Sequence, residues 1–231
     1  MIFISLLLAF YFAPFAGAAY SASPPNQVTI ESEIVTTESG NHKISDLFPA
    51  ETPILLVPAY YNCNSTCPLL AENLKQAIMS ANASSLIGIL FVSFNSEDDS
   101  TAMVNFRKHH GLPKEWVLSV IKNPNRAKDF LAPFQYTYQK TNNGFDHPNA
   151  AFVFSARPRV WTGSLYGVDI TQGEMKTALD AATLTHQAGL QASVKRAFGK
   201  KEYLILLGII GTILPLFLIA WIFFRKSATV V

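Results

Sequence analysis

The chain has 231 residues, a formal net charge of +2 and only 15% charged residues, against roughly 25% in soluble proteins. Its hydrophobic content of 49% is concentrated at the two ends, which leaves about 165 residues between them, enough for one domain with one core. The sequence contains no internal repeat, glycine-rich phosphate loop, nucleophile elbow or nucleic-acid-binding module. These classes are therefore excluded, and no nucleic-acid partner is expected.

The amino-terminal end is expected to be a signal peptide, residues 1–22. No residue from Met1 to Ala19 has a charged side chain, and small residues offer cleavage sites after Ala18 or Ala22. The apolar run lacks a basic segment ahead of it, so a retained anchor is the alternative.

The carboxyl-terminal end is expected to be a transmembrane helix, residues 203–224. This uncharged stretch would form a helix of roughly 33 Å, enough to cross a bilayer core of about 30 Å. The basic linker 189–202 before it is expected to attract anionic headgroups of the lipid bilayer, and residues 225–231 would be a short cytoplasmic tail.

The orientation of this span follows from two conflicting signals. More basic residues precede the span than follow it, which by the positive-inside rule would place the domain in the cytoplasm. A signal peptide predicts the opposite side, and we give it more weight. We therefore expect a C-terminally anchored domain that faces away from the cytoplasm, in the bacterial periplasm.

Residues 24–188 alternate between strand and helix patterns. An edge hairpin is expected first, over residues 27–37 with its turn at 39–41. Apolar runs predict buried strands, and apolar residues at helical spacing predict the helices between them. The expected strands are 54–60, 86–94, 116–118, 150–155 and 160–161, and the expected helices are 68–81, 101–110, 126–130 and 171–183. Strands that alternate with helices imply a layered α/β domain with a partly parallel sheet, whose sites form where strands end and helices begin.

The only two cysteines, Cys63 and Cys67, lie four positions apart directly after the first of these strands. Thiols at a strand-to-helix turn lie beside free backbone N–H groups and the positive end of the helix dipole, and both favour the thiolate. The turn is therefore a predicted site of sulfur chemistry. The buried face of the helix that follows is expected to consist of Leu69, Leu70, Leu74, Ala77 and Ile78.

A candidate third ligand, His147, directly precedes the expected strand 150–155. Adjacent strands end at one edge of a sheet, which raises the chance that this imidazole lies near the thiols. Two thiolates and one imidazole form a soft set of ligands that favours Cu(I), whereas Zn(II) would need a fourth. The other histidines are expected at a helix end, in a turn and in the basic segment, as His109 with His110, His42 and His186 respectively.

Together these motifs resemble the Sco family, also called SenC, of copper-binding thioredoxin-fold proteins that assist the assembly of cytochrome c oxidase. The resemblance rests on the run 54–68 with its two cysteines, on the segment 94–100 and on Asp146-His147, and it covers about residues 40–185. It implies a thioredoxin-like three-layer domain with an N-terminal β-hairpin. It further implies that Cys63, Cys67 and His147 are the copper ligands, for Cu(I) or also Cu(II).

The same resemblance implies two protein partners, the copper-bearing subunit of cytochrome c oxidase and a thiol reductant protein. The chain departs from the family pattern in several places. Asn95 stands where an acidic residue is usual, although Asp99 fits a further acidic position, and Glu51-Thr52 replaces the usual Gly-Lys. Most members have an N-terminal anchor, whereas this chain is expected to have a C-terminal one.

Three hypotheses of different classes remain open. The first is a copper chaperone, a metallochaperone rather than an enzyme. The second is a thiol–disulfide oxidoreductase in which Cys63 or Cys67 attacks and copper is incidental, although redox enzymes of this fold generally have two residues between their cysteines. The third is a tethered binding module with a structural disulfide, since cysteine pairs in exported domains commonly form disulfide bonds.

Overall fold

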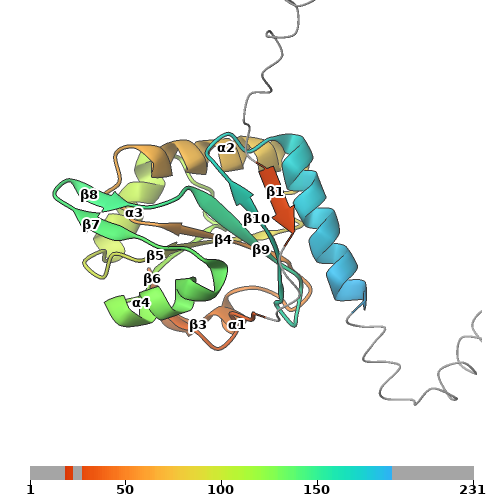
Figure 1. Cartoon of the computed structure of the whole chain (residues 1–231), viewed down its shortest axis with the longest axis horizontal. Coiled ribbons are helices and arrows are strands. Elements are labelled where there is room, and N and C mark those ends of the chain that lie inside the picture. Colours follow the sequence, from red (N-terminus) through yellow and green to blue (C-terminus); the bar gives the residue numbers. More distant parts are fainter. Residues whose placement is uncertain (1–18, 23–27, 189–231) are drawn as a thin grey trace, which may run out of the picture. The chain divides into compact units, whose positions relative to one another are not determined.

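The computed structural model of the chain describes residues 19–22 and 28–188 (Figure 1). In chain order its elements are β1 (Ala19–Ala22), β2 (Ile34–Thr37), β3 (Gly40–Lys43), α1 (Ile44–Leu47), β4 (Ile54–Ala59), α2 (Thr66–Ser80), β5 (Gly88–Ser93), α3 (Ser100–His109), β6 (Val117–Val120), α4 (Pro124–Leu131), the 3₁₀ helix η1 (Ala132–Phe134), β7 (Gln139–Thr141), β8 (Gly144–Asp146), β9 (Ala150–Phe154), β10 (Trp161–Tyr166) and a last helix over residues 172–188.

One mixed sheet has the strand order β1-β10-β9-β4-β5-β6-β2-β3, and β7 and β8 form a separate hairpin. Strand β5 is parallel to both β4 and β6, and the remaining neighbours are antiparallel. The predicted α/β domain with a partly parallel sheet is therefore confirmed.

Different helices cover the two faces of this sheet. Phe91 of β5 packs against Phe106 of α3, with ring centroids 6.1 Å apart, and Phe152 of β9 packs against Phe134 of η1 at 4.9 Å. The register places Phe91 and Phe152 beside consecutive residues of β4, and consecutive residues of a strand point to opposite faces. Helices α3 and η1 therefore lie on opposite faces, and Figure 1 shows α2 and α4 likewise on opposite sides of the sheet. This is the expected three-layer arrangement.

Strand β4 lies at the centre of the core and directs the chain toward the cysteines. All six of its residues are buried. Its ladder to β9 ends at the pair Leu56–Phe152, whereas its ladder to β5 continues to Ala59. Pro58 has no backbone N–H to continue a second ladder, so β4 and β9 part at this end of the sheet. The segment that leads into β9 can therefore place His147 beside the turn that follows β4.

Two expectations need correction. The N-terminal hairpin, expected over residues 27–37 with its turn at 39–41, consists of β2 and β3 and turns at residues 38–39. Ahead of β2, Thr29 forms only an isolated bridge with Val160. Leu69, expected in the buried face of α2, is 47% exposed. The buried stripe begins two residues earlier, at a cysteine, and comprises Cys67, Leu70, Ala71, Leu74, Ala77 and Ile78.

Residue contacts divide the chain into two units, Met1–His186 and Gln187–Val231, and the structure described above belongs to the first except for residues 187–188. The expected signal peptide before residue 19, the linker 189–202, the membrane span 203–224 and the tail 225–231 lie outside the described residues. Within the described ranges, no helix is long and apolar enough to cross a membrane.

Candidate metal centre

The structure brings the three predicted ligands together. The sulfur atoms of Cys63 and Cys67 and a ring nitrogen of His147 all lie within 4.8 Å of one another. Cys63 lies in the turn after β4, Cys67 in the first turn of α2, and His147 in the loop between β8 and β9. Both cysteines are free thiols and are almost fully buried, with exposed fractions of 2% and 3%.

The sulfur of Cys63 serves as the missing cap of helix α2. The N-cap residue, Ser65, makes no side-chain capping bond, so the first N–H groups of the helix need another acceptor. The backbone N–H of Cys67 donates to the Cys63 sulfur at 3.4 Å, and the Ser65 hydroxyl lies 3.6 Å from the same sulfur. These contacts favour the thiolate form of Cys63.

The two thiols have opposite acidities. The hydrogen bond with the Cys67 thiol lowers the pKa of Cys63 strongly, and bonds with His147 and with backbone N–H groups add to this effect, while burial opposes it. The pKa of Cys67 is raised, because its thiol donates to Cys63 and because it is buried beside that negative charge. These opposite shifts favour the thiolate at Cys63 and the thiol at Cys67, and a bound cation would replace the proton of Cys67.

His147 presents one particular nitrogen to the sulfurs. Its Nε2 lies 3.7 Å from the Cys67 sulfur, and its Nδ1 lies 3.0 Å from the Pro148 carbonyl oxygen. A carbonyl only accepts hydrogen bonds, so in the neutral ring Nδ1 carries the hydrogen and Nε2 carries the lone pair, whereas the protonated ring also donates to the Cys63 sulfur. Metal-binding histidines commonly donate their other ring N–H in this way. Burial alone would lower the pKa of His147, but the hydrogen bonds with Cys63 and the Pro148 carbonyl raise it overall.

Aromatic side chains enclose the imidazole, and the sequence analysis did not identify them as part of the site. The rings of Tyr60 and Phe94 meet the His147 ring edge-on, at centroid distances of 5.8 and 5.4 Å, and the Tyr136 hydroxyl lies 3.0 Å from its Nδ1. Burial and a hydrogen bond to Cys63 raise the pKa of Tyr60 to about 12, so its hydroxyl remains protonated. Tyr60 and Phe94 directly follow the buried strands β4 and β5, but this position alone does not distinguish them from ordinary core residues.

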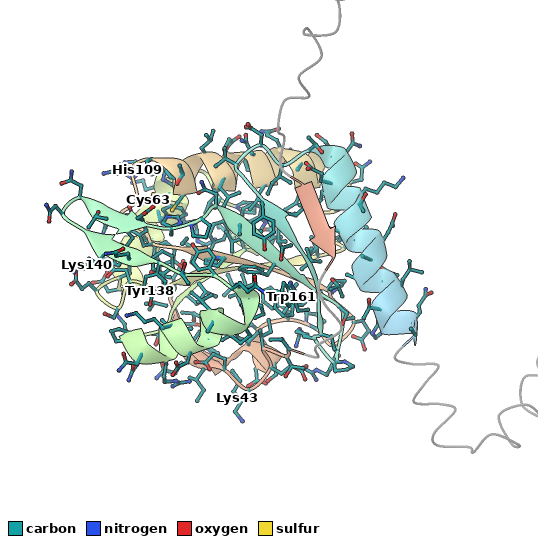
Figure 2. The ribbon with its side chains drawn as sticks, viewed as in Figure 1. Lys43, Cys63, His109, Tyr138, Lys140 and Trp161 are labelled. Carbon is teal, nitrogen blue, oxygen red and sulfur yellow. The ribbon has the colours of Figure 1, made fainter. Side chains whose placement is uncertain are left out.

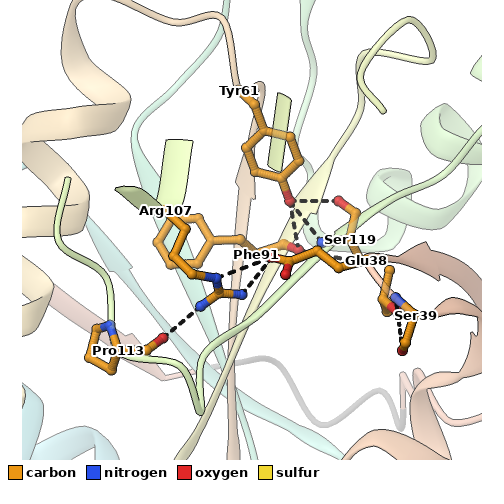
Figure 3. A network of polar contacts seen from close by, with 8 residues as sticks. Glu38, Ser39, Tyr61, Phe91, Arg107, Pro113 and Ser119 are labelled. Atoms are coloured by element: carbon orange, nitrogen blue, oxygen red, sulfur yellow. Dashed lines mark hydrogen bonds and ion pairs between the residues drawn. The ribbon is translucent and has the colours of Figure 1, made fainter. Parts of the chain in front are cut away.

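Tyr61 and Asp98 hold the cysteine turn in place. The Tyr61 hydroxyl donates to the Ser119 carbonyl at 2.7 Å and accepts from the Ser119 N–H at 2.8 Å, which ties the turn to β6 (Figure 3). The backbone N–H of Tyr61 donates to the Asp98 carboxylate at 2.7 Å. Asp98 is only 1% exposed and also accepts from Ser93 and from the side-chain amides of two asparagines.

Asn95, which departs from the Sco pattern, and Asp99, which fits it, both have structural roles. Asn95 is buried and donates its side-chain amide to Asp98 at 3.1 Å. Asp99 is the N-cap of α3 and accepts from the backbone N–H of Ala102 at 2.8 Å. Neither belongs to the Cys63, Cys67 and His147 group, so this segment supports the site from outside.

Fold and site together define a thioredoxin-like domain with a Cys-Cys-His cluster at the end of its central strand. No protein-family model matches the chain, and no curated protein is similar to it in sequence. Several solved structures share its fold. One is BsSco, a member of the Sco family of cytochrome c oxidase assembly proteins, with 16% identity, a TM-score of 0.58 and coverage of 70% of this chain and 97% of that one.

Two further structures show the same likeness. Copper-bound ScoI of Arabidopsis thaliana is 16% identical, with a TM-score of 0.54 and coverage of 64% and 94%. A protein of Aquifex aeolicus that bears the description of an electron transfer protein is 22% identical, with a TM-score of 0.61 and coverage of 68% and 93%. The resemblance to Sco proteins expected from the motifs is thus confirmed as a shared fold.

Proposed function

We propose that this protein is a copper chaperone that holds Cu(I) between Cys63, Cys67 and His147. The observation that carries the proposal is the convergence of two sulfurs and one imidazole nitrogen within 4.8 Å. Thiolate ligands select Cu(I), and the described residues supply no fourth histidine, cysteine or carboxylate for a tetrahedral Zn(II) site. The fold shared with copper-bound ScoI supports the same assignment.

Release of the ion requires access to the site. A hollow of about 300 Å³ opens beside His147, lined by Thr137–Gln139 and Asp146–Pro148. A partner's sulfur or nitrogen that enters there can bind the ion while it is still held by the two thiolates, so copper passes by ligand exchange without being set free. We propose that the recipient is the copper-bearing subunit of a haem–copper oxidase and that a thiol reductant protein keeps the cysteines reduced, because a disulfide cannot bind the ion.

The proposed location of the protein rests on the composition of the two ends of its sequence. We propose that the chain is exported and tethered to the bilayer by residues 203–224, so that the copper site works on the periplasmic side. The uncharged span and the small-residue cleavage sites support this proposal.

The test is a competition titration of the reduced full chain with Cu(I) against a chelator. We expect one tightly bound equivalent. His147→Ala should weaken binding by more than the roughly 10–100-fold caused by loss of a mere outer-shell partner. His42→Ala is the matched control, since His42 lies in the β2–β3 hairpin and bonds to Ser39, and it should bind like the unaltered chain. Equal affinities for both variants would rule out the ligand assignment.

One observation favours a second function, thiol–disulfide exchange. The lowered pKa of Cys63, caused chiefly by the Cys67 thiol, favours the nucleophilic thiolate at neutral pH. The near-complete burial of both sulfurs restricts attack on a protein disulfide, so we place this function second. A Cys63–Cys67 reduction potential well below about −300 mV would indicate an inert bond and exclude it.

A further inference from the structure

A second hollow borders the cysteine turn, and it shares no lining residue with the hollow beside His147. It has a volume of about 330 Å³ and lies between the cysteine turn and helix α3. Cys63 and its neighbours form one wall, and His109 and His110 form part of the other, whereas neither Cys67 nor His147 lines it. In Figure 2 the labelled Cys63 and His109 lie at the same end of the molecule.

His109 makes a hydrogen bond through one ring nitrogen, which leaves its other ring nitrogen able to bind a metal. Its Nδ1 lies 3.3 Å from the carbonyl oxygen of Asn105. Because the carbonyl can only accept, Nδ1 carries the hydrogen and the lone pair is on Nε2. The same arrangement orients His147, whose Nδ1 faces the Pro148 carbonyl. The hydrogen bond from His109 to Asn105 could serve only to end helix α3. A second imidazole, His110, and the Cys63 thiol line the same hollow, and a role at the helix end does not explain their presence there.

His110 is positioned by packing. Its ring meets Phe106 edge-on at a centroid distance of 4.7 Å, and its own centroid lies 6.3 Å from that of His109. Two imidazoles that share one ion through bonds of about 2.0–2.1 Å have ring centres about 6 Å apart when the ion lies between them. The observed distance between the ring centres matches that of two imidazoles that share one ion.

We propose that His109 and His110 form a transfer site through which copper reaches the Cys63 sulfur. The inference rests on the proposed chaperone function and names the route by which its cargo moves. Imidazole binds both oxidation states of copper, and the ion keeps its charge during the step. Copper–nitrogen bonds break as the copper–sulfur bond forms, and the proton still held by the thiol pair passes to solvent.

The two hollows then have different roles, one in the entry of copper and the other in its release. Copper arrives through the His109–His110 side and reaches Cys63 first, and the recipient protein takes it from the His147 side. Because the transfer site lies outside the three-ligand group, its loss should slow loading, and the reverse step by the same route, without weakening the final complex.

The experiment measures the rate of Cu(I) transfer from a chelator complex to the reduced full chain by stopped-flow absorbance, and the equilibrium affinity in parallel. The double variant His109→Ala/His110→Ala should load at least tenfold more slowly with unchanged affinity. The single variants should fall between it and the unaltered chain, which keeps the test valid if the double variant folds poorly. His42→Ala is again the control, with unchanged rate and affinity.

Two results would overturn the inference. An unchanged loading rate would show that the histidines only end the helix. A parallel loss of rate and affinity would show that they support the fold or the main site. If the unaltered chain binds no Cu(I), the proposed function itself fails, and that outcome is distinct from both.

Discussion

The chemistry of the site depends on which atoms are left free by local hydrogen bonds. The Pro148 carbonyl accepts a hydrogen bond from Nδ1 of His147, so that Nε2 faces the sulfurs. The backbone N–H of Cys67 donates to the Cys63 sulfur. Each ligand atom is therefore oriented before the ion arrives. Such preorganisation reduces the entropy that binding would otherwise cost.

Asp98 is the residue on which the position of the cysteine turn depends most. One carboxylate oxygen accepts from the Tyr61 N–H and the Ser93 hydroxyl, and the other accepts from two side-chain amides. Asp98→Asn would turn one oxygen into a donor that faces other donors. We expect a loss of about 1–3 kcal/mol in the free energy of unfolding, measured by urea denaturation, together with weaker Cu(I) binding.

Glu97→Gln is the matched control for this change. Glu97 is the preceding residue, and its ion pair with Lys140 is largely exposed, so its loss should change stability by less than about 1 kcal/mol. A stable Asp98→Asn variant with full Cu(I) affinity would refute the role given to Asp98.

The ligands could be predicted from the sequence because cysteine and histidine are chemically distinctive and stand at strand ends. The aromatic side chains that enclose His147, those of Tyr60, Phe94 and Tyr136, could not be predicted from the sequence, because aromatic residues next to apolar runs are usually core residues. Which of them turn toward an imidazole depends on the tertiary path of the chain. The role of Asp98 in holding the cysteine turn could not be predicted either, since the pattern of this segment indicates only a helix cap, which is the neighbouring Asp99.

At the scale of elements, the β7–β8 hairpin closes the site over Tyr60. Gly144 has a φ of +136°, and a Cβ there would lie 2.5 Å from the Tyr60 hydroxyl oxygen. Gly144→Ala should therefore displace Tyr60, whose ring packs on His147. We expect reduced Cu(I) affinity in the competition titration in addition to a loss of stability.

Gly40→Ala separates the two effects. Gly40 has a similar φ of +121°, but no heavy atom lies within 4 Å of the added Cβ. Both variants should lose about 1–3 kcal/mol of stability from backbone strain, and only Gly144→Ala should bind Cu(I) more weakly. Equal affinities for the two variants would show that the hairpin does not support the site.

The long, apolar helices and strands were predictable because burial of one or both faces produces a regular spacing of apolar residues in the sequence. Strands β4, β5 and β9 and helices α2 and α3 all fall within or beside the expected ranges. The β7–β8 hairpin was missed, because Gln139–Thr141 is short, exposed and polar and Gly144–Asp146 has only three residues. Its formation depends on packing over Tyr60, which no local pattern reveals.

At the scale of the whole molecule, strand β1 bears on how the chain is processed. Residues 19–22 pair antiparallel with β10 along their full length, so a cut after Ala22 would remove a strand and expose the edge of β10. Unpaired edges promote aggregation. Cleavage after Ala18 preserves the strand, and it also presents Ala16 and Ala18 in the small-x-small pattern of signal peptidase sites.

We therefore expect the mature protein to begin at Ala19. The intact mass of protein purified from membranes, together with its N-terminal sequence, measures this directly. A chain that begins at Ser23, or one that keeps Met1, would contradict the expectation, and the second result would favour a retained anchor.

The central claim is that Cu(I) is held by two sulfurs and the His147 nitrogen. X-ray absorption spectroscopy of the reduced, Cu(I)-loaded full chain tests it most directly, because sulfur and nitrogen neighbours scatter distinguishably. We expect two sulfurs and one nitrogen bound to the copper, with the nitrogen lost in His147→Ala. A shell of sulfur alone in the unaltered chain, or a nitrogen that persists in His147→Ala, would contradict it.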